Sequence, residues 1–190
     1  MKVAVVSESL HDSNAIINLL NRHYSIEFSP VLETITGSSL DATSRTSKLL
    51  QKELRSEDYS FVLYIRDLDA SRLHREKMLE RIQWFRKLNK GNGRNGVFLL
   101  NIYELEALIL ADIDTFNKNY GTTINFTVNP MHQSNPKEFL KDETRKVKKQ
   151  YAEGHCPDLF KKLDIDKLIA CEDFYFKRFI DDIEARINPK

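Results

Sequence analysis

FVLYIRDLD, at residues 61–69, carries the clearest indication of the fold class. Its first five residues form an apolar run rich in β-branched and aromatic side chains, which is typical of a strand buried on both faces of a sheet. Charged side chains begin at Arg66 and continue with Asp67 and Asp69, so the strand ends where polar chemistry starts. A parallel sheet covered by helices is the usual setting of such a strand.

Three other apolar runs predict strands on either side of this one: residues 3–6, 26–32 and 97–102. A segment with apolar residues at helical spacing follows each of the four strands. This alternation predicts an α/β fold, Rossmann-like, with a mostly parallel four-stranded sheet flanked by helices. Residues 1–115 are expected to form this core, and residues 116–190 to form a helical C-terminal extension packed on it.

Specific residues are expected to shape the helices. The first helix should begin at an N-cap of Asp12 or Ser13. The helix after Asp69 should turn five apolar side chains inward: Leu73, Leu79, Ile82, Phe85 and Leu88. In the extension, helices are expected at about residues 137–151, 157–170 and 172–186.

The composition bounds the class of protein. The chain has 190 residues, of which 41% are hydrophobic and 30% are charged, enough for a buried core and a charged surface. No apolar run approaches ~18 residues and the N-terminus lacks a signal-peptide pattern, so we expect a cytoplasmic protein without a membrane partner. Cys156 and Cys171 do not suffice for a disulfide framework or a zinc motif. The net charge of +1 argues against a strongly basic nucleic-acid coat, although local patches still count.

Six acids follow three of the predicted strands. They are Glu8 and Asp12 after the first strand, Asp67 and Asp69 after the third, and Glu104 and Glu106 after the last. Functional residues of an open parallel sheet gather beyond the carboxyl ends of its strands, so neighbouring strands would bring the three groups together. Converging carboxylates repel one another unless a cation lies between them. Mg²⁺ or Mn²⁺ fits, because these ions take oxygen ligands, whereas zinc favours thiolates and imidazoles.

Each acid also has a structural interpretation. Glu8 suits a helix cap or a solvated strand end, and Asp67-Leu68-Asp69 suits the cap of a helix that starts near Ser71. Glu104 and Glu106 suit the first turn of a helix, where the helix dipole favours acids. The joint placement after three strands is what favours a metal site.

Two segments resemble the motifs of Toprim domains. The first Toprim motif is a strand, then Glu-Gly, then a second acid; residues 5–12 read VVSESLHD, with Ser9 in place of the glycine. The second motif is an apolar strand that ends in Asp-x-Asp, as residues 61–69 do. The segment YELEALILAD, residues 103–112, is similar to one in a narrower group of small bacterial proteins with a Toprim-like domain of unknown function.

The resemblance implies a Mg²⁺-dependent enzyme related to nucleases of the overcoming-lysogenization-defect type. It assigns Glu8 as a metal ligand or general acid or base, and Asp67 and Asp69 as catalytic metal ligands. The remaining acids would hold a second ion or complete the shell: Asp12, Glu104 and Glu106. Two ions ~4 Å apart would clamp the attacking and leaving oxygens of a phosphodiester. The likeness to these nucleases implies nucleic acid as substrate. The small group is also similar to proteins encoded beside ATPases in bacterial anti-phage systems, which implies an ATPase as partner.

Four basic residues are candidates for contacts with nucleic acid. Arg66, beside the Asp-x-Asp, suits either a bidentate phosphate contact or a pair with one of the carboxylates. Lys146, Lys148 and Lys149 belong to the most basic stretch, residues 137–149. That stretch is typical of a solvated helix face, and it is also compatible with a helix that contacts phosphate.

Two other functions stay open at this point. A catalytically inactive Toprim-like subunit would regulate an ATPase or recognise a phage or host component, and the serine at position 9 favours this alternative. A receiver-like phosphoacceptor domain also has acids at strand ends, but it needs a lysine after the last core strand, and none is well placed. Aromatic residues crowd positions 174–179, and any of them that are exposed could form a contact between two copies of the chain. A homo-oligomer is therefore expected as one possible state, whichever function holds.

Overall fold

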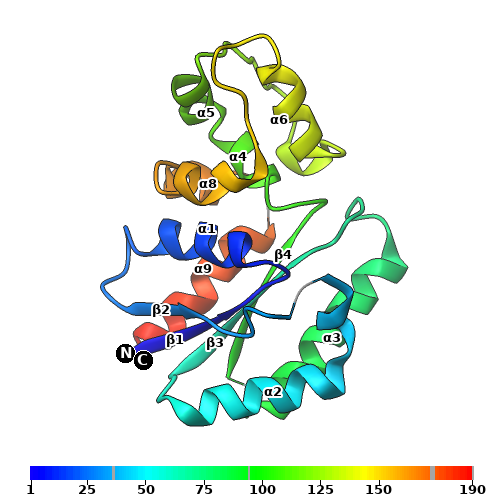
Figure 1. Cartoon of the computed structure of the whole chain (residues 1–190), viewed down its shortest axis with the longest axis vertical. Coiled ribbons are helices and arrows are strands. Elements are labelled where there is room, and N and C mark those ends of the chain that lie inside the picture. The colour runs from blue at the N-terminus through cyan, green and yellow to red at the C-terminus, as the bar shows by residue number, and fades with distance from the viewer. Residues whose placement is uncertain (36, 94, 172–173, 190) are drawn as a thin grey trace.

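The structure is a computed structural model that describes residues 1–35, 37–93, 95–171 and 174–189. Its centre is a four-stranded, all-parallel sheet, shown in Figure 1: β1 (Lys2–Val6), β2 (Glu27–Pro30), β3 (Phe61–Asp67) and β4 (Gly96–Asn101). The predicted α/β fold class, of Rossmann-like type, is confirmed. Pro30 ends the edge strand β2, where its missing N–H leaves no gap inside the sheet.

The strand order is β2-β1-β3-β4, so the sheet grows in two directions from its middle. After β1 the chain adds β2 on one side, and it then crosses over to add β3 and β4 on the other side. At such a reversal the connections leave neighbouring strands in opposite directions, which opens a crevice beyond the carboxyl ends of the strands. A ligand site is therefore expected beyond the ends of β1 and β3.

Helices cover both faces of the sheet. The four that do so are α1 (Leu10–Leu20), α2 (Thr43–Ser56), α3 (Arg75–Gly91) and, from the end of the chain, α9 (Phe174–Ile187). Leu63 of β3 belongs to the core that includes α1 and α9, whereas its neighbour Tyr64 belongs to the core beneath α2 and α3. This follows because successive strand residues point to opposite faces.

A helical lobe lies above the carboxyl ends of the strands in Figure 1. Its helices are α4 (Ala107–Ala111), α5 (Ile113–Tyr120), α6 (Pro136–Thr144), α7 (Cys156–Phe160) and α8 (Ile165–Ala170). Short 3-10 turns complete the chain: η1 (Gly37–Asp41), η2 (Pro130–His132) and η3 (Glu153–His155). Asn18 Nδ2 of α1 donates to the Pro157 carbonyl of α7 at 2.9 Å, which fastens the lobe to the sheet region. The domain boundary at residue 115 stays a prediction.

The start of α1 differs from the prediction. Ser9 is the N-cap rather than Asp12 or Ser13, because its hydroxyl accepts a hydrogen bond from the Asp12 N–H at 3.2 Å. The φ of Ser9 is −144°, which is extended backbone, so no glycine is needed at this position. The departure from the Toprim motif therefore supplies a helix cap without backbone strain.

The buried side of α3 was predicted only in part. The helix begins at Arg75, so the interpretation of the preceding aspartates as caps of a helix near Ser71 is wrong. Leu73 precedes the helix and is 82% exposed, and Leu79 is exposed as well. The helix buries three residues: Arg81, Trp84 and Leu88. One of these is an arginine, which a search for apolar periodicity passes over.

The helix predicted at residues 137–151 is also shorter than expected, because α6 ends at Thr144. The Thr144 hydroxyl donates to the Leu140 carbonyl at 3.0 Å and accepts from the Tyr151 N–H at 2.8 Å, which turns the chain back on itself. The first two residues of the helix predicted at 172–186 lie outside the described residues. Within the described ranges, no helix is long and apolar enough to cross a membrane.

Candidate functional site

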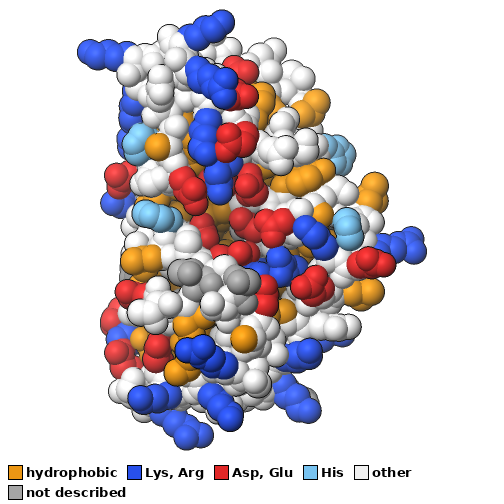
Figure 2. Space-filling view, turned by 45° about the vertical axis from the view of Figure 1, so that its right-hand side comes forward, with side chains coloured by type: hydrophobic (Ala, Val, Ile, Leu, Met, Phe, Trp, Pro, Cys, Tyr) orange, Lys and Arg blue, Asp and Glu red, His pale blue; other side chains and the backbone are white. Residues whose placement is uncertain are grey.

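The candidate site lies at the reversal of the sheet, between the strand ends and the helical lobe. Glu8 follows β1, Asp67 ends β3 and Asn101 ends β4, while Glu104 and Glu106 lead into α4. Figure 2 shows acidic side chains gathered around a hollow at mid-height of one face, with basic side chains among them. The topology thus brings together the acids that follow three different strands.

Hydrogen bonds tie the end of β3 to both neighbouring strands. The Asp67 N–H donates to Glu8 Oε1 at 3.1 Å, and Asn101 Nδ2 donates to Asp67 Oδ1 at 2.9 Å. Leu68, between the two aspartates, is fully buried, and Asp69 adopts a φ of +53°. The Asp-x-Asp pair therefore lies where the strand opens into a loop, with its side chains held outside the apolar core.

Two buried arginines hold these acids from inside the protein. Arg66 is 1% exposed, and its Nε lies 3.1 Å from Glu8 Oε1. Arg81, on α3, donates to Asp69 Oδ2 and to the Asp67 carbonyl, both at 3.0 Å. Of the two roles expected for Arg66, the structure contains the carboxylate pair, and the phosphate contact stays a prediction.

A single lysine lies among the acids on the side of the site that faces the helical lobe. Lys137 Nζ lies 3.7 Å from Glu104, 3.8 Å from Glu106 and 3.6 Å from Glu153. Tyr151 donates its hydroxyl to Glu106 Oε1 at 3.3 Å. Lys137 and Tyr151 both come from the C-terminal extension, so the extension completes a site that begins in the sheet.

Burial raises the pKa of four of the acids. Burial and then the nearby charge of Asp12 raise the pKa of Asp67 well above its ordinary value. Burial also raises the pKa of Asp12, and it raises the pKa of Glu8 despite the nearby arginine. The pKa of Glu106 is raised to about 7 by burial, against the charge of Lys137. The acids thus influence one another, and the protein leaves their ionised forms incompletely stabilised.

The donor set suits a hard divalent cation. It offers carboxylate oxygens together with Asn101 Oδ1, a buried atom with no hydrogen-bond partner among the described residues. A cation between the acids would lower their raised pKa values. In the part of the chain that the structure describes, no three Asp, Glu, His or Cys side chains already lie close enough to form a metal shell. Binding an ion would therefore draw the acids away from their arginine and lysine partners.

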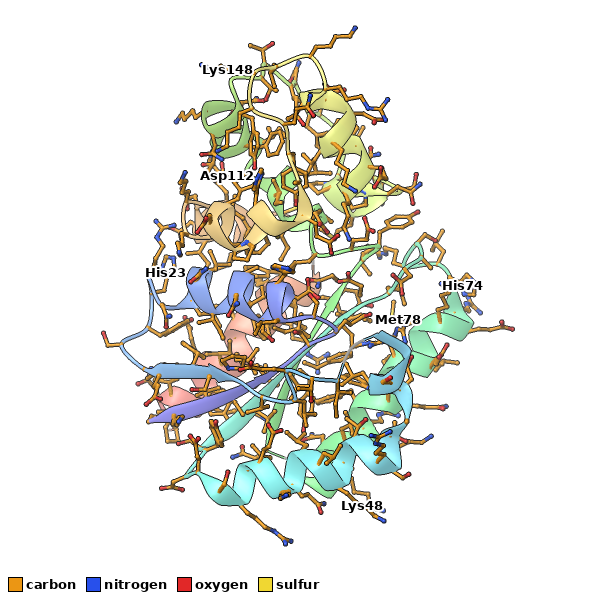
Figure 3. All side chains as sticks on the ribbon, in the orientation of Figure 1. His23, Lys48, His74, Met78, Asp112 and Lys148 are labelled. Atoms are coloured by element: carbon orange, nitrogen blue, oxygen red, sulfur yellow. The ribbon has the colours of Figure 1, made fainter. Side chains whose placement is uncertain are left out.

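The three lysines predicted to contact nucleic acid lie outside this cluster. Lys146, Lys148 and Lys149 are exposed in the turn after α6, and Figure 3 places Lys148 at the far tip of the helical lobe. Lys149 Nζ lies 4.7 Å from the centroid of the Tyr120 ring. Their contact with nucleic acid stays a prediction, on a surface separate from the acids.

Sequence reasoning missed four residues of the site: Arg81, Asn101, Lys137 and Tyr151. Asn101 offered a usable signal, because it is a polar residue near the end of the predicted strand at residues 97–102. Lys137 was interpreted only as part of a basic stretch. Its backbone N–H donates to Glu104 Oε2 across 33 positions of sequence, and no local pattern reports a contact of that kind.

Comparison with known proteins supplies a family for the chain. A family model described as "Domain of unknown function (DUF4276)" matches residues 11–184. The match spans β2 to β4, the helical lobe and most of α9, and it begins just after Glu8. No curated protein and no solved structure matches the chain.

Proposed function

The chain belongs to the family described as a domain of unknown function (DUF4276), and we propose that it is a Mg²⁺- or Mn²⁺-dependent, Toprim-type phosphodiester hydrolase that acts on nucleic acid. One observation carries the proposal: acids with raised pKa values meet where the sheet reverses. These acids are Glu8, Asp12, Asp67 and Glu106. Perturbed acids gathered at the ligand-binding position of an α/β sheet support a catalytic role over a purely structural one.

The proposed ligands of the ion are the acids at the ends of the strands. Glu8, Asp67 and Asp69 would hold one ion, and the other acids would hold a second ion or complete the shell: Asp12, Glu104 and Glu106. Bound there, a divalent cation supplies Lewis-acid stabilisation of the charge that develops on a phosphodiester.

The protein's own groups would orient the substrate and move protons. Glu8, with a raised pKa, keeps or takes up a proton more readily than an exposed glutamate, which suits a general acid or base. Arg66 and the Asp67 N–H fix the direction of its carboxylate. Lys137 brings a positive charge to the opposite side of the site, where it would attract a phosphate group.

We extend the proposal to the setting in which the protein works: an effector subunit of a bacterial anti-phage system, in the cytoplasm, with an ATPase partner. This extension rests on the resemblance of residues 103–112 to a narrower group of small bacterial proteins, which is similar to proteins encoded beside ATPases of anti-phage systems. The net charge of +1 supports reliance on a partner, since the chain as a whole has little electrostatic attraction for nucleic acid.

The test is a cleavage assay on labelled single- and double-stranded DNA and RNA, with Mg²⁺ or Mn²⁺, in the presence and absence of the ATPase. We expect metal-dependent cleavage that falls about 100-fold or more in Asp67→Asn, because the substitution removes a negative ligand and nearly preserves shape. Asp58→Asn is the matched control, since Asp58 is exposed just before the opposite end of β3. Equal activity of the two variants would overturn the proposal.

A second function is favoured by the ion pairs of the site. Arg66, Arg81 and Lys137 already neutralise acids of the cluster, as expected if the fold serves as a catalytically inactive binding or regulatory subunit of an ATPase complex. In that case Glu8→Ala and Asp69→Ala would leave the function of the native complex intact. A hydrolase would lose its function in both variants.

A further inference from the structure

A second concave site lies along the outer edge of the sheet, where β4 runs between α3 and α9. It is a cavity of ≈ 410 Å³, within the range of ~300–1,000 Å³ that ligand sites occupy. None of its lining residues is one of the acids of the candidate site described above. The chemistry of its walls therefore calls for an explanation of its own.

Aromatic rings form one wall of this cavity. Phe85 of α3 and Phe98 of β4 stack with ring centroids 4.7 Å apart and planes 5° from parallel, and both are only partly buried. Tyr175 of α9 lines the same space. A flat, partly exposed aromatic pair offers a stacking surface for a planar ligand.

Three arginines line another part of the cavity wall. Arg86 extends from α3, and Arg178 and Arg186 extend from α9, while Asp182 is the acid among the described lining residues. Arg186 is held in place by bonds from Nη2 to the Gly96 carbonyl at 3.0 Å and from Nη1 to the Asp182 carbonyl at 3.1 Å. Three guanidinium groups against one carboxylate give the cavity a positive charge, which favours an anionic ligand.

Two polar atoms beside the cavity have unused hydrogen-bonding capacity. Asn89 Oδ1 and Arg186 Nε are buried and have no hydrogen-bond partner among the described residues. Gly96 allows Asn89 to lie this close to β4, because a Cβ at Gly96 would come 2.7 Å from Asn89 Oδ1. An acceptor and a donor are thus positioned next to the aromatic and cationic groups, which adds the polar component that ligand sites need.

We propose that this cavity binds a nucleoside phosphate unit, as a free nucleotide or as one unit of a single strand. The base would stack on an outer face of the Phe85–Phe98 pair, and the arginines would hold the phosphate. An acidic peptide would pair with the arginines and leave the aromatic wall without a planar partner, and an apolar partner would leave the net positive charge of the cavity without an anion. The site lies apart from the carboxylate cluster, so the proposal goes beyond the hydrolase and does not depend on its metal.

The test is calorimetric titration of the intact protein in EDTA with AMP, ribose 5-phosphate and (dT)₁₂. We expect AMP to bind about tenfold more tightly than ribose 5-phosphate, because only AMP carries a base that can stack. Arg86→Glu should weaken binding of AMP by about tenfold. Lys87→Glu, the next residue on the same helix, makes the same change of charge outside the cavity and should change the Kd by less than about twofold.

Further arms identify the source of the ligand and the role of the rings. Tighter binding of (dT)₁₂ than of AMP would identify the ligand as a single strand of nucleic acid. Tighter binding of AMP would identify it as a free nucleotide. Phe85→Leu should abolish the preference for AMP over ribose 5-phosphate. The proposal is overturned by any of three results: no binding of AMP or (dT)₁₂, equal losses in the Arg86 and Lys87 variants, or a decaglutamate peptide that binds as tightly as (dT)₁₂. Because EDTA removes divalent cations, these titrations do not test the metal site. A negative result would therefore leave the hydrolase proposal unaffected, and loss of the hydrolase proposal would leave this one unaffected.

Discussion

Glu106 and Asp112 lie at the two ends of α4 and are both almost fully buried, yet their pKa values shift in opposite directions. Burial would raise the pKa of Asp112, but its bonds outweigh that effect and lower the pKa: Lys167 Nζ donates at 2.8 Å and the Asp164 N–H at 2.9 Å. At Glu106 the nearest cation, Lys137, is 3.8 Å away, and burial raises the pKa to about 7.

The contrast separates an acid that holds the fold together from acids that are available for chemistry. Asp112, labelled in Figure 3, connects the junction of α4 and α5 to the start of α8 through fully formed hydrogen bonds. Glu8, Asp67 and Glu106 all have raised pKa values, so their charges are incompletely satisfied. Groups of this second kind bind a proton or a metal cation most readily near neutral pH.

The largest effect on stability should come from removing the side chain of Asp112. Asp112→Ala should lower the free energy of unfolding by about 4 kcal/mol at pH 7, because it removes a fully buried carboxylate and leaves its donors, the Asp164 N–H among them, without their acceptor. Asp114→Ala is the matched control: Asp114 lies 2.9 Å from the same lysine and its side chain is 68% exposed, so its loss should cost less than about 1 kcal/mol. Urea denaturation measures both, and equal losses would contradict the contrast.

The stability of the same variant should depend on pH in a way that reports the charge of Asp112. Because the folded protein lowers the pKa of Asp112, the stabilisation is present above 3.8, the ordinary pKa, and is lost as the pH falls. The difference between the free energies of unfolding of wild type and Asp112→Ala should therefore narrow in acid. A gap between them that stays constant down to about pH 2 would show that packing rather than charge sets the loss.

Glu106 should show the opposite pH dependence. Its pKa rises from 4.5 to about 7 on folding, so its contribution is fully present below pH 4.5 and is lost as the pH rises through 7. Measured in EDTA, wild type should lose on the order of 3 kcal/mol of stability across this window relative to Glu106→Gln. Glu153→Gln removes a 53% exposed acid that lies 3.6 Å from the same lysine, and it should keep the wild-type profile. If Glu106→Gln shows the same dependence of stability on pH as wild type, Glu106 is not one of the acids with a raised pKa.

The smallest effect concerns the lysine that competes with metal. Lys137→Met should tighten Mg²⁺ binding by about three- to tenfold, because it removes a positive charge near Glu104 and Glu106. Lys141→Met, on the same helix, removes a lysine that pairs with the exposed Glu138, and it should leave the affinity unchanged. Weaker Mg²⁺ binding in Lys137→Met would mean that the lysine positions the acids instead of competing for them.

The sheet and one half of the site could be predicted from sequence because their signals are local. Residues 61–67 form a strand in which every residue but the last is buried, so apolar runs located the strands well. Asp67 and Asp69 follow directly from that strand, and the strand ends of a parallel sheet converge by geometry. Helix boundaries were less predictable, since α6 ends through a bond between the Thr144 hydroxyl and the Tyr151 N–H.

The other half of the site depends on contacts between distant parts of the chain. Lys137 reaches Glu104 and Glu106 only after the lobe folds over the strand ends. Arg81 is buried in a helix whose apolar pattern suggested a different inward face, which also explains the exposed Leu79. The environment of such residues is set by tertiary packing, which the periodicity of apolar residues along the sequence does not predict.

Calorimetric titration with Mg²⁺ and Mn²⁺ tests directly whether the acids at the reversal of the sheet bind a divalent cation. Wild type should bind, and at pH 7 the heat should depend on the buffer, because acids with raised pKa values release protons to the buffer when a cation binds. Asp67→Asn/Asp69→Asn should lose this binding, while Asp58→Asn keeps it. No binding in folded wild type, or equal binding in wild type and the double variant, would contradict the account.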